Sequence, residues 1–262
     1  CFTFTSCFDL RFNLLANAHH ELKEYDKAIK YYHQAIDVLK RNGEDLPVLA
    51  DYFNNLGTTY LLDKDYEKAQ LYLKAGLRIN LMNNPPDSYE ASKSYHNLGS
   101  FYTEFNKYDS AIYYYQKCLK NRVKIFGTNS VTVAYTHSYL GRMYEHFDSL
   151  HLALKHYHMA LHSLVKEVDE DDVYAAPIIT QKNYKSYLLD IVIQKAHIFR
   201  KIYMSKGTLS DLEAALTYYN LGDFLNDLSR RSLNQEDSKL FLEGYHEADF
   251  AQGIKVAYLV YN

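Results

Sequence analysis

Three cysteines are the residues whose chemistry could support covalent catalysis or a thiolate metal site. They are Cys1, Cys7 and Cys118, and none belongs to a CxxC pair or lies at a ligand spacing from a histidine. A nucleophilic thiol also needs a neighbouring base, and the sequence identifies no such partner. The cysteines therefore predict no catalytic or metal site, and we expect Cys118 to be an inert, buried packing residue.

Histidines are the other candidate ligands, because His158 and His162 are four residues apart and His151 lies seven before His158. On a helix, this spacing would present three imidazoles on one face to a metal ion. The alternative, which we favour, is that these histidines lie on a solvated helix face. The sequence contains no HExxH, GxGxxG or GxxxxGK[ST] motif. We therefore predict no metal, no cofactor and no catalytic residue.

The composition limits both the partners and the class of fold. Basic and acidic residues number 29 and 32, a net charge of −3 that gives no basic field for nucleic acid. The sequence contains no run of 18 apolar residues, the length needed to cross a membrane. Four prolines and ten glycines favour helices, and three cysteines without a pairing pattern indicate a reducing cytoplasm. Because the sequence starts at Cys1, we expect it to begin inside a longer polypeptide.

A repeat of about 42 residues organises the first two thirds of the chain. A leucine followed by a small residue recurs at intervals of 41, 42 and 42, and small residues recur again 12 and 19 positions later. Within each half of a repeat, the apolar residues follow the spacing of a helix that buries one face. Each repeat is therefore predicted to be a pair of closely packed helices. The leucine–small pairs are Leu15-Ala16, Leu56-Gly57, Leu98-Gly99 and Leu140-Gly141.

The pattern Leu-Gly-x-x-Tyr, followed by an alanine, an aromatic and another small residue, resembles the tetratricopeptide repeat. The 42-residue spacing is similar to the longer variant found in kinesin light chains. This resemblance implies an all-α fold, a right-handed superhelical solenoid of helix-turn-helix repeats with about five and a half units. Tyr95 and His137 stand where the family often has tryptophan, and Leu150 replaces an expected tyrosine.

Two regions are predicted along the chain. Residues 1–167 hold four repeats of about 42 residues. Residues 168–262 hold an irregular insertion, a fifth repeat that contains Ala196 and Ala215, and the first helix of a sixth repeat at Ser238–Tyr261. A terminal repeat without its partner helix exposes a stacking face, so we expect the natural chain to continue.

The tail carries a second resemblance. Leu212–Leu221, Arg230-Arg231-Ser232 and Glu236–Leu242 resemble the segment that precedes the caspase-like peptidase domain of bacterial repeat proteins of the CHAT family. The resemblance implies that the chain is the regulatory, N-terminal part of a larger protein. A C-terminal caspase-like domain of the same polypeptide would then be a partner.

The tetratricopeptide resemblance, combined with helical phase, places the binding residues on the first helix of each repeat. Positions three before, two before and one after the small residue are expected to line the inner wall of the superhelix. Asparagine there can pair with the backbone of an extended peptide whatever the peptide's side chains. The lysine clamp of chaperone-binding relatives is not matched. The candidate peptide-binding residues are Asn13, Asn17, Asn54, Asn55, Thr58, His96, Asn97, Ser100, Ser138 and Arg142.

Three functional hypotheses follow from these patterns. The first, which we favour, is a non-catalytic module that captures a protein or an extended peptide segment. The second is a scaffold that self-associates through an uncapped end of the solenoid, and the third is an enzyme in its own right. The sequence does not identify the partner or say whether binding activates or restrains a following domain.

Overall fold

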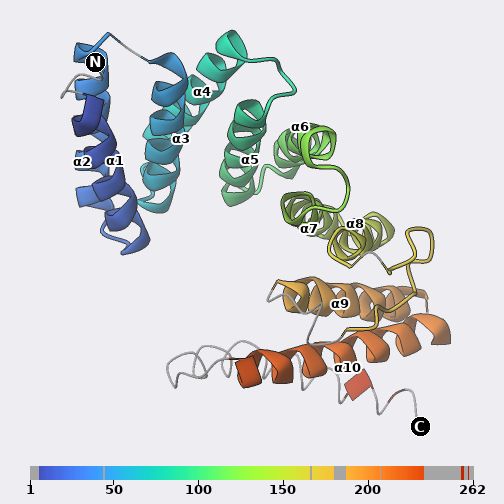
Figure 1. Cartoon of the computed structure of the whole chain (residues 1–262). Helices are drawn as coiled ribbons and strands as arrows, with labels where there is room; N and C mark the ends of the chain where they lie inside the picture. The colour runs from blue at the N-terminus through green and yellow to red at the C-terminus, as the bar shows by residue number, and fades with distance from the viewer. Residues whose placement is uncertain are drawn as a thin grey trace. The chain divides into compact units, whose positions relative to one another are not determined.

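The computed structural model of the chain describes residues 6–43, 45–165, 167–179, 187–206 and 208–232, together with 255, 256 and 259 (Figure 1). Ten α-helices and no β-strand lie in these ranges. The helices are α1 (Ser6–Glu21), α2 (Tyr25–Arg41), α3 (Leu46–Leu62), α4 (Tyr66–Asn83), α5 (Tyr89–Glu104), α6 (Tyr108–Phe126), α7 (Val131–His146), α8 (Leu150–His162), α9 (Leu188–Lys206) and α10 (Leu209–Ser232).

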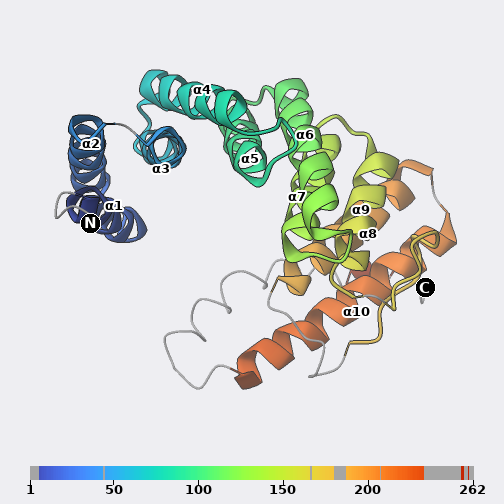
Figure 2. The same cartoon turned by 45° about the horizontal axis from the view of Figure 1, so that its top comes forward.

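The helices pack in sequence order within two compact units, residues 1–125 and 126–262. In the first unit α1 pairs with α2 and α3 with α4, and each pair contacts the next helix along the chain (Figure 1). The odd-numbered helices also contact one another, α1 with α3 and α3 with α5. In the second unit α7 pairs with α8 and α9 with α10, while α8 contacts α9 (Figure 2). The predicted all-α repeat solenoid is confirmed.

Small residues let the two helices of a repeat approach closely, as the sequence predicts. A Cβ atom added to Gly57 would lie 2.7 Å from Leu73 Cγ, and one added to Gly99 would lie 2.6 Å from Tyr115 Cε1. In both repeats the large residue stands 16 positions after the glycine, on the second helix, and is fully buried. Any larger side chain at the glycine would therefore push the pair apart.

The turn inside each of the first four repeats contains a residue with positive φ that is not glycine. These residues recur at the same place in the repeat: Lys23 (φ 60°), Lys64 (φ 66°), Asn106 (φ 54°) and Asp148 (φ 51°). In the second repeat the Lys64 N–H bonds to the Leu61 carbonyl and the Asp65 N–H to the Tyr60 carbonyl. This Schellman pattern satisfies the last carbonyls of the first helix, at the cost of a left-handed conformation that a side chain disfavours.

An aromatic trio recurs in each of the first four repeats and fills the space between its two helices. In the second repeat the rings of Tyr60 and Tyr72 stack with centroids 5.6 Å apart. In the third, Tyr102 and Tyr114 stack at 5.4 Å and 4°. The trios use 7 of the 27 tyrosines of the chain, whose rings bury apolar area between the two helices. The trios are Phe12/His19/Tyr31, Phe53/Tyr60/Tyr72, Tyr95/Tyr102/Tyr114 and His137/Tyr144/His156.

The fourth trio differs because two of its rings are imidazoles. The Nδ1 atoms of His137 and His156 are 3.0 Å apart, so one ring donates a hydrogen bond and the other accepts it. Burial, with a smaller contribution from His156, lowers the pKa of His137 to about 3. Burial likewise lowers the pKa of His156 to about 4, with a smaller contribution from Lys155. Both histidines are therefore neutral at physiological pH.

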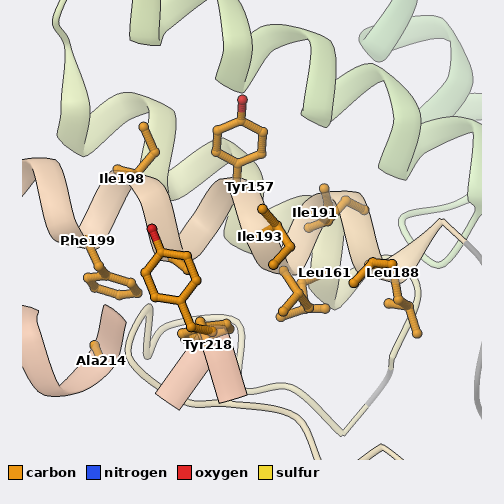
Figure 3. Close-up of a cluster of buried hydrophobic side chains, with 14 of the residues drawn as sticks. Tyr157, Leu161, Leu188, Ile191, Ile193, Ile198, Phe199, Ala214 and Tyr218 are labelled. Atoms are coloured by element: carbon orange, nitrogen blue, oxygen red, sulfur yellow. The ribbon is translucent and has the colours of Figure 1, made fainter. Parts of the chain in front are cut away.

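The core of the second unit lies between α8, α9 and α10. Figure 3 shows Tyr157 and Leu161 of α8 near Ile193 of α9, with Tyr218 of α10 close to Phe199 of α9. The rings of Phe199 and Tyr218 stack with centroids 5.7 Å apart. The residues predicted above to form a fifth repeat lie in α9 and α10.

The predicted irregular insertion is described over residues 167–179, where the chain forms no helix. Its first part is bound to α8 by two imidazoles. His158 Nε2 lies 2.8 Å from the carbonyl oxygen of Asp169, and His162 Nδ1 lies 2.8 Å from the carbonyl oxygen of Val168. These histidines therefore contribute hydrogen bonds that hold the insertion against the repeat.

The predicted sixth-repeat helix at Ser238–Tyr261 lies outside the described residues, except for positions 255, 256 and 259. The part of the CHAT-like segment at Glu236–Leu242 also lies outside them. Among the helices that the structure describes, none is long and apolar enough to span a bilayer.

Candidate functional site

The candidate site lies on the first helices of the second and third repeats, α3 and α5. Asp51 of α3 and Lys93 of α5 occupy the same repeat position, 42 residues apart, and Lys93 Nζ lies 2.6 Å from Asp51 Oδ1. Both side chains are partly exposed, at 46% for Asp51 and 34% for Lys93. A surface ion pair of this kind contributes little stability, so it marks which residues of α3 and α5 face each other, while helix packing sets that register.

Asn55 and Asn97 lie one helical turn beyond this ion pair, each on the same helix face as its charged neighbour. Because Asp51 and Lys93 meet, the two asparagines are brought into the same register on adjacent helices. Both are half-buried, and within the described residues no hydrogen bond is formed by either side-chain amide. We call Asp51, Asn55, Lys93 and Asn97 the amide face.

Asn54, a predicted ligand residue, points instead into the interior of the first unit. It is 3% exposed, and its Nδ2 donates to Ser94 Oγ at 3.0 Å. Asn80 of α4 donates to the same Ser94 oxygen at 3.0 Å. A Cβ on Gly76 would lie 3.0 Å from Asn54 Oδ1. The Asn54 amide therefore joins α3, α4 and α5, and its burial leaves it no room to contact a peptide.

Thr58 and Ser100, one position after each glycine, use their hydroxyls within the repeat. Thr58 Oγ1 donates to the carbonyl oxygen of Asn55 at 2.8 Å. Ser100 Oγ lies 3.2 Å from the Tyr115 hydroxyl, the ring that fills the space beside Gly99. Both residues are half-buried, so they border the amide face but offer it fewer free polar groups than the asparagines.

The candidate residues of the first repeat and the third-repeat histidine have polar atoms that are buried or bonded within the fold. Asn17 Oδ1 accepts a hydrogen bond from the Tyr32 hydroxyl at 2.6 Å. Asn13 Oδ1 is buried and has no hydrogen-bond partner in the described part of the chain. Burial, followed by the charge of Arg122, lowers the pKa of His96 to about 4. His96 is therefore a neutral packing residue near physiological pH.

The second unit contributes Ser138 and Arg142 of α7, which the structure places differently. Ser138 is 7% exposed, and its hydroxyl has no partner among the described residues. Arg142 is exposed, with its guanidinium carbon 5.6 Å from the centre of the Tyr139 ring. Only Arg142 of this pair presents a polar group at the surface.

Sequence reasoning missed Asp51 and Lys93, whose ion pair marks the register of the amide face. The available signal was their 42-residue separation combined with opposite charge, at a position six before each glycine. Helical phase places this position on the same face as the asparagine four residues later.

A buried polar cluster in the second unit was also missed. Lys195 of α9 is 0% exposed, and its Nζ donates to the Tyr218 hydroxyl at 2.6 Å and to His158 Nδ1 at 2.9 Å. The Tyr218 hydroxyl in turn donates to the carbonyl oxygen of Ala175 at 2.6 Å. The sequence does not indicate that Lys195 is buried, because lysine is usually a surface residue.

The geometry of the cluster suits an uncharged lysine. A neutral amine has two N–H donors, and both find an acceptor here, the Tyr218 hydroxyl and His158 Nδ1. Burial lowers the pKa of Lys195 to about 7, against an opposing effect of Asp172. Because the amine is closed off from solvent, we assign it the role of fastening the insertion to α8, α9 and α10.

The residues first considered for chemistry are placed as follows. Cys118 is fully buried at a small-residue site on α6, beside Ala91 and Tyr95. The predicted solvated face is wrong for His158, which is 1% exposed, because His158 and His162 both use ring nitrogens in hydrogen bonds to the insertion. Within the described residues, no group of three histidine, cysteine or carboxylate side chains could hold a metal ion.

The comparisons with known proteins agree on the fold. A family model described as "Tetratricopeptide repeat" matches residues 10–81 and 90–162. The structure of BtubC (BKLC) from P. vanneervenii is 18% identical, with a TM-score of 0.69 over 85% of this chain and 81% of that one. A kinesin light chain with nearly identical TPR-like repeats, from Podosopora anserina, is 12% identical, with a TM-score of 0.67 over 88% and 100%.

RapI in its apo form is 16% identical, with a TM-score of 0.66 over 95% of this chain and 61% of that one. No curated protein matches the sequence. At these identities the solved structures share the fold with this chain, and they include the kinesin-light-chain type of repeat.

Proposed function

Because the chain belongs to the tetratricopeptide repeat family, whose members are generally non-catalytic scaffolds for protein interactions, we propose that it is a non-catalytic module that binds an extended segment of another protein. The observation that carries the proposal is the pair of uncommitted amides, Asn55 and Asn97, held in register on α3 and α5.

Each asparagine amide offers one acceptor oxygen and an NH₂ donor, the complement of a peptide group. Two of them in register can hydrogen-bond to the backbone of an extended segment without selecting its side chains. The other candidate polar groups on these helices are buried or bonded within the repeat. Asn55 and Asn97 are therefore the proposed backbone contacts, with Arg142 as a separate surface group of the second unit.

The first repeat continues the same positions with apolar side chains. Leu10 and Leu14 stand where α3 has Asp51 and Asn55, and they are 52% and 58% exposed. Leu62, at the carboxyl end of α3, is 50% exposed. We therefore propose that the bound segment carries an apolar residue at the end that lies over α1.

The experiment is selection of ligands from a displayed library of random 12-residue peptides, followed by affinity measurement on the purified chain. Asn55→Ala and Asn97→Ala should each weaken the selected peptides about 5- to 10-fold, since a hydrogen bond in such a site contributes about 1 kcal/mol. Methylation of backbone nitrogens in the peptide should weaken binding by a similar factor.

The matched control is Asn220→Ala, because Asn220 is an exposed asparagine on α10 of the second unit and is not one of the residues of the amide face. Its removal should leave affinity unchanged. Failure to select any peptide, or selected peptides whose binding ignores both Asn55 and Asn97, would overturn the proposal.

We further propose that this binding regulates a caspase-like domain of the same polypeptide in the cytoplasm. The support is the resemblance of Leu212–Leu242 to the segment that precedes such domains in CHAT proteins, of which α10 contains Leu212–Ser232. The full open reading frame tests this directly, since a caspase-like domain should follow Asn262. A reading frame that lacks such a domain would refute it.

A further inference from the structure

The first helices of the fourth and fifth repeats, α7 and α9, contact each other at two places. Near their amino ends, the rings of Tyr135 and of Tyr187, the residue directly before α9, lie with centroids 5.5 Å apart. Nearer their carboxyl ends, Lys201 Nζ lies 2.6 Å from Glu145 Oε1. Both contacts lie within the second unit, so the strip between them is bordered by neighbouring helices of one compact unit.

The packing of α9 on α10 establishes which repeat position each residue of α9 occupies. A Cβ atom added to Gly222 of α10 would lie 2.5 Å from Ile193 Cδ1. In the second repeat, a Cβ added to Gly76 would lie 3.0 Å from the side chain of Asn54, the residue directly before an asparagine of the amide face. Gln194, directly after Ile193, is therefore equivalent to the amide-face asparagines. It is half-buried, and its side-chain amide forms no hydrogen bond within the described residues.

Two side chains of opposite charge lie on the same strip. Arg142 of α7 and Asp190 of α9 are both exposed, and neither forms an ion pair in the described part of the chain. Burial raises the pKa of Tyr157, and the charges of Glu145, Arg142 and Asp190 have smaller effects on it. Charges from both helices therefore lie around the same buried tyrosine of α8. Because Glu145 is paired with Lys201, Arg142 and Asp190 are left available to a ligand.

We call Arg142, Asp190 and Gln194 the α7–α9 face. Asp190 and Gln194 are four residues apart, so they lie on one side of α9. A guanidinium binds a carboxylate through two parallel hydrogen bonds, and an aspartate pairs with lysine or arginine. The glutamine amide offers a donor and an acceptor to a peptide group. Together these groups suit an extended segment that carries both an acidic and a basic side chain.

We propose that the α7–α9 face binds an extended protein segment, whose backbone bonds to Gln194 and whose acidic and basic side chains pair with Arg142 and Asp190. Neighbouring helices lie about 10 Å apart and an extended chain advances about 3.3 Å per residue, so the two charged residues should be about three positions apart. The inference rests on the proposed capture of an extended segment, but it uses the second unit alone. It adds a charge preference that the amide face lacks, since Asp51 and Lys93 pair with each other.

The test is selection from the displayed peptide library on the Asn55→Ala/Asn97→Ala double variant, which removes both amides of the amide face. Selected peptides should carry an acidic and a basic residue about three positions apart. They are synthesised with blocked termini, so that their charges are on side chains alone. Arg142→Glu and Asp190→Lys, added to the double variant, should each weaken binding about 10-fold, and Gln194→Ala about 5-fold.

Charge reversal distinguishes direct pairing from a structural effect. A peptide whose acidic residue is replaced by lysine should bind the double variant weakly and bind the Arg142→Glu form about as well as the original pair. The matched controls are Lys155→Glu on α8 and Glu213→Lys on α10, exposed residues of the same unit with the same changes of charge. Both should leave affinity within about twofold, because charges outside the contact are screened. Helical circular dichroism checks that each variant folds.

Two results would overturn the inference while leaving the proposed function intact. The first is a double variant that selects no peptide, although the wild type selects peptides that depend on Asn55 and Asn97. The second is a set of selected peptides that bind all three α7–α9 face variants as tightly as the double variant, or that lose equal affinity in Arg142→Glu and Lys155→Glu. If the wild type also selects no peptide, both proposals fail.

Discussion

Replacing Lys195 by methionine should stabilise the protein at neutral pH and destabilise it at pH 10. The pKa of this lysine falls from 10.5 to about 7 on folding, because burial disfavours its charged form. Between these values the unfolded chain binds a proton that the folded chain does not. The stability linked to Lys195 is therefore full above pH 10.5 and is lost as the pH falls to 7.

The magnitude follows from about 1.4 kcal/mol per pKa unit, which makes this cost about 4 kcal/mol at pH 7 and below about 1 kcal/mol at pH 10. Methionine fills a similar volume and removes the cost. It also removes two hydrogen bonds, to Tyr218 and His158, for a loss of about 2–3 kcal/mol. The net change in the free energy of unfolding should be a gain of about 1–2 kcal/mol at pH 7 and a loss of similar size at pH 10.

Urea unfolding followed by circular dichroism at pH 7, 8.5 and 10 measures this difference. Burial raises the pKa of Tyr218, but that tyrosine is present in both proteins and cancels in the comparison. Lys155→Met, a change at an exposed lysine of α8, should alter stability by less than about 0.5 kcal/mol at each pH. If Lys195→Met shifted stability by the same amount at pH 7 and pH 10, the assignment of a neutral buried amine would be wrong.

Two further predictions concern the repeats themselves. His137 and His156 have lowered pKa values, so their contribution to stability is full above pH 6.5 and is lost as the pH falls towards 3. Urea unfolding at pH 6.5 and 5 should show that the H137Y/H156Y double variant loses about 3 kcal/mol less than the wild type, and equal losses would contradict this. Lys64→Gly should raise the unfolding free energy by about 0.5–1 kcal/mol, because φ is 66° at Lys64, whereas Lys74→Gly inside α4 should lower it by about 1 kcal/mol. Equal losses in both glycine variants, measured by urea unfolding, would refute the strain argument.

The repeat, the helices and their close contacts could be predicted from the sequence. Gly57 and Gly99 signalled helix approach because only a residue without a side chain leaves room for Leu73 and Tyr115, and this restriction is local and recurs every 42 residues. The turn residues such as Lys64 gave no such signal. Their left-handed conformation is imposed by the two helices that they join, and lysine has no preference for it.

The candidate site shows where sequence reasoning stops. Asn54 and Asn55 are adjacent and chemically identical, and helical phase put both in the predicted site. Tertiary packing separates them, because α4 approaches closely at Gly76 and turns the Asn54 amide into a buried link to Ser94, while Asn55 stays uncommitted. Successive side chains on a helix are rotated by about 100°, so one of two neighbouring residues can be buried and the other exposed. Only the packing of the neighbouring helices decides which one is buried.

The amino-acid sequence by itself determined the repeat length, the helix pairs and the small-residue contacts, since these follow from periodicity and side-chain volume. Only the tertiary structure decided the state of Lys195 and the burial of the Asn54 amide. Both depend on the residues that other elements place around a side chain: Tyr218 and His158 around the lysine, and Ser94 beside the asparagine. Solvation and hydrogen bonding depend on these surrounding residues, so no local sequence pattern predicts them.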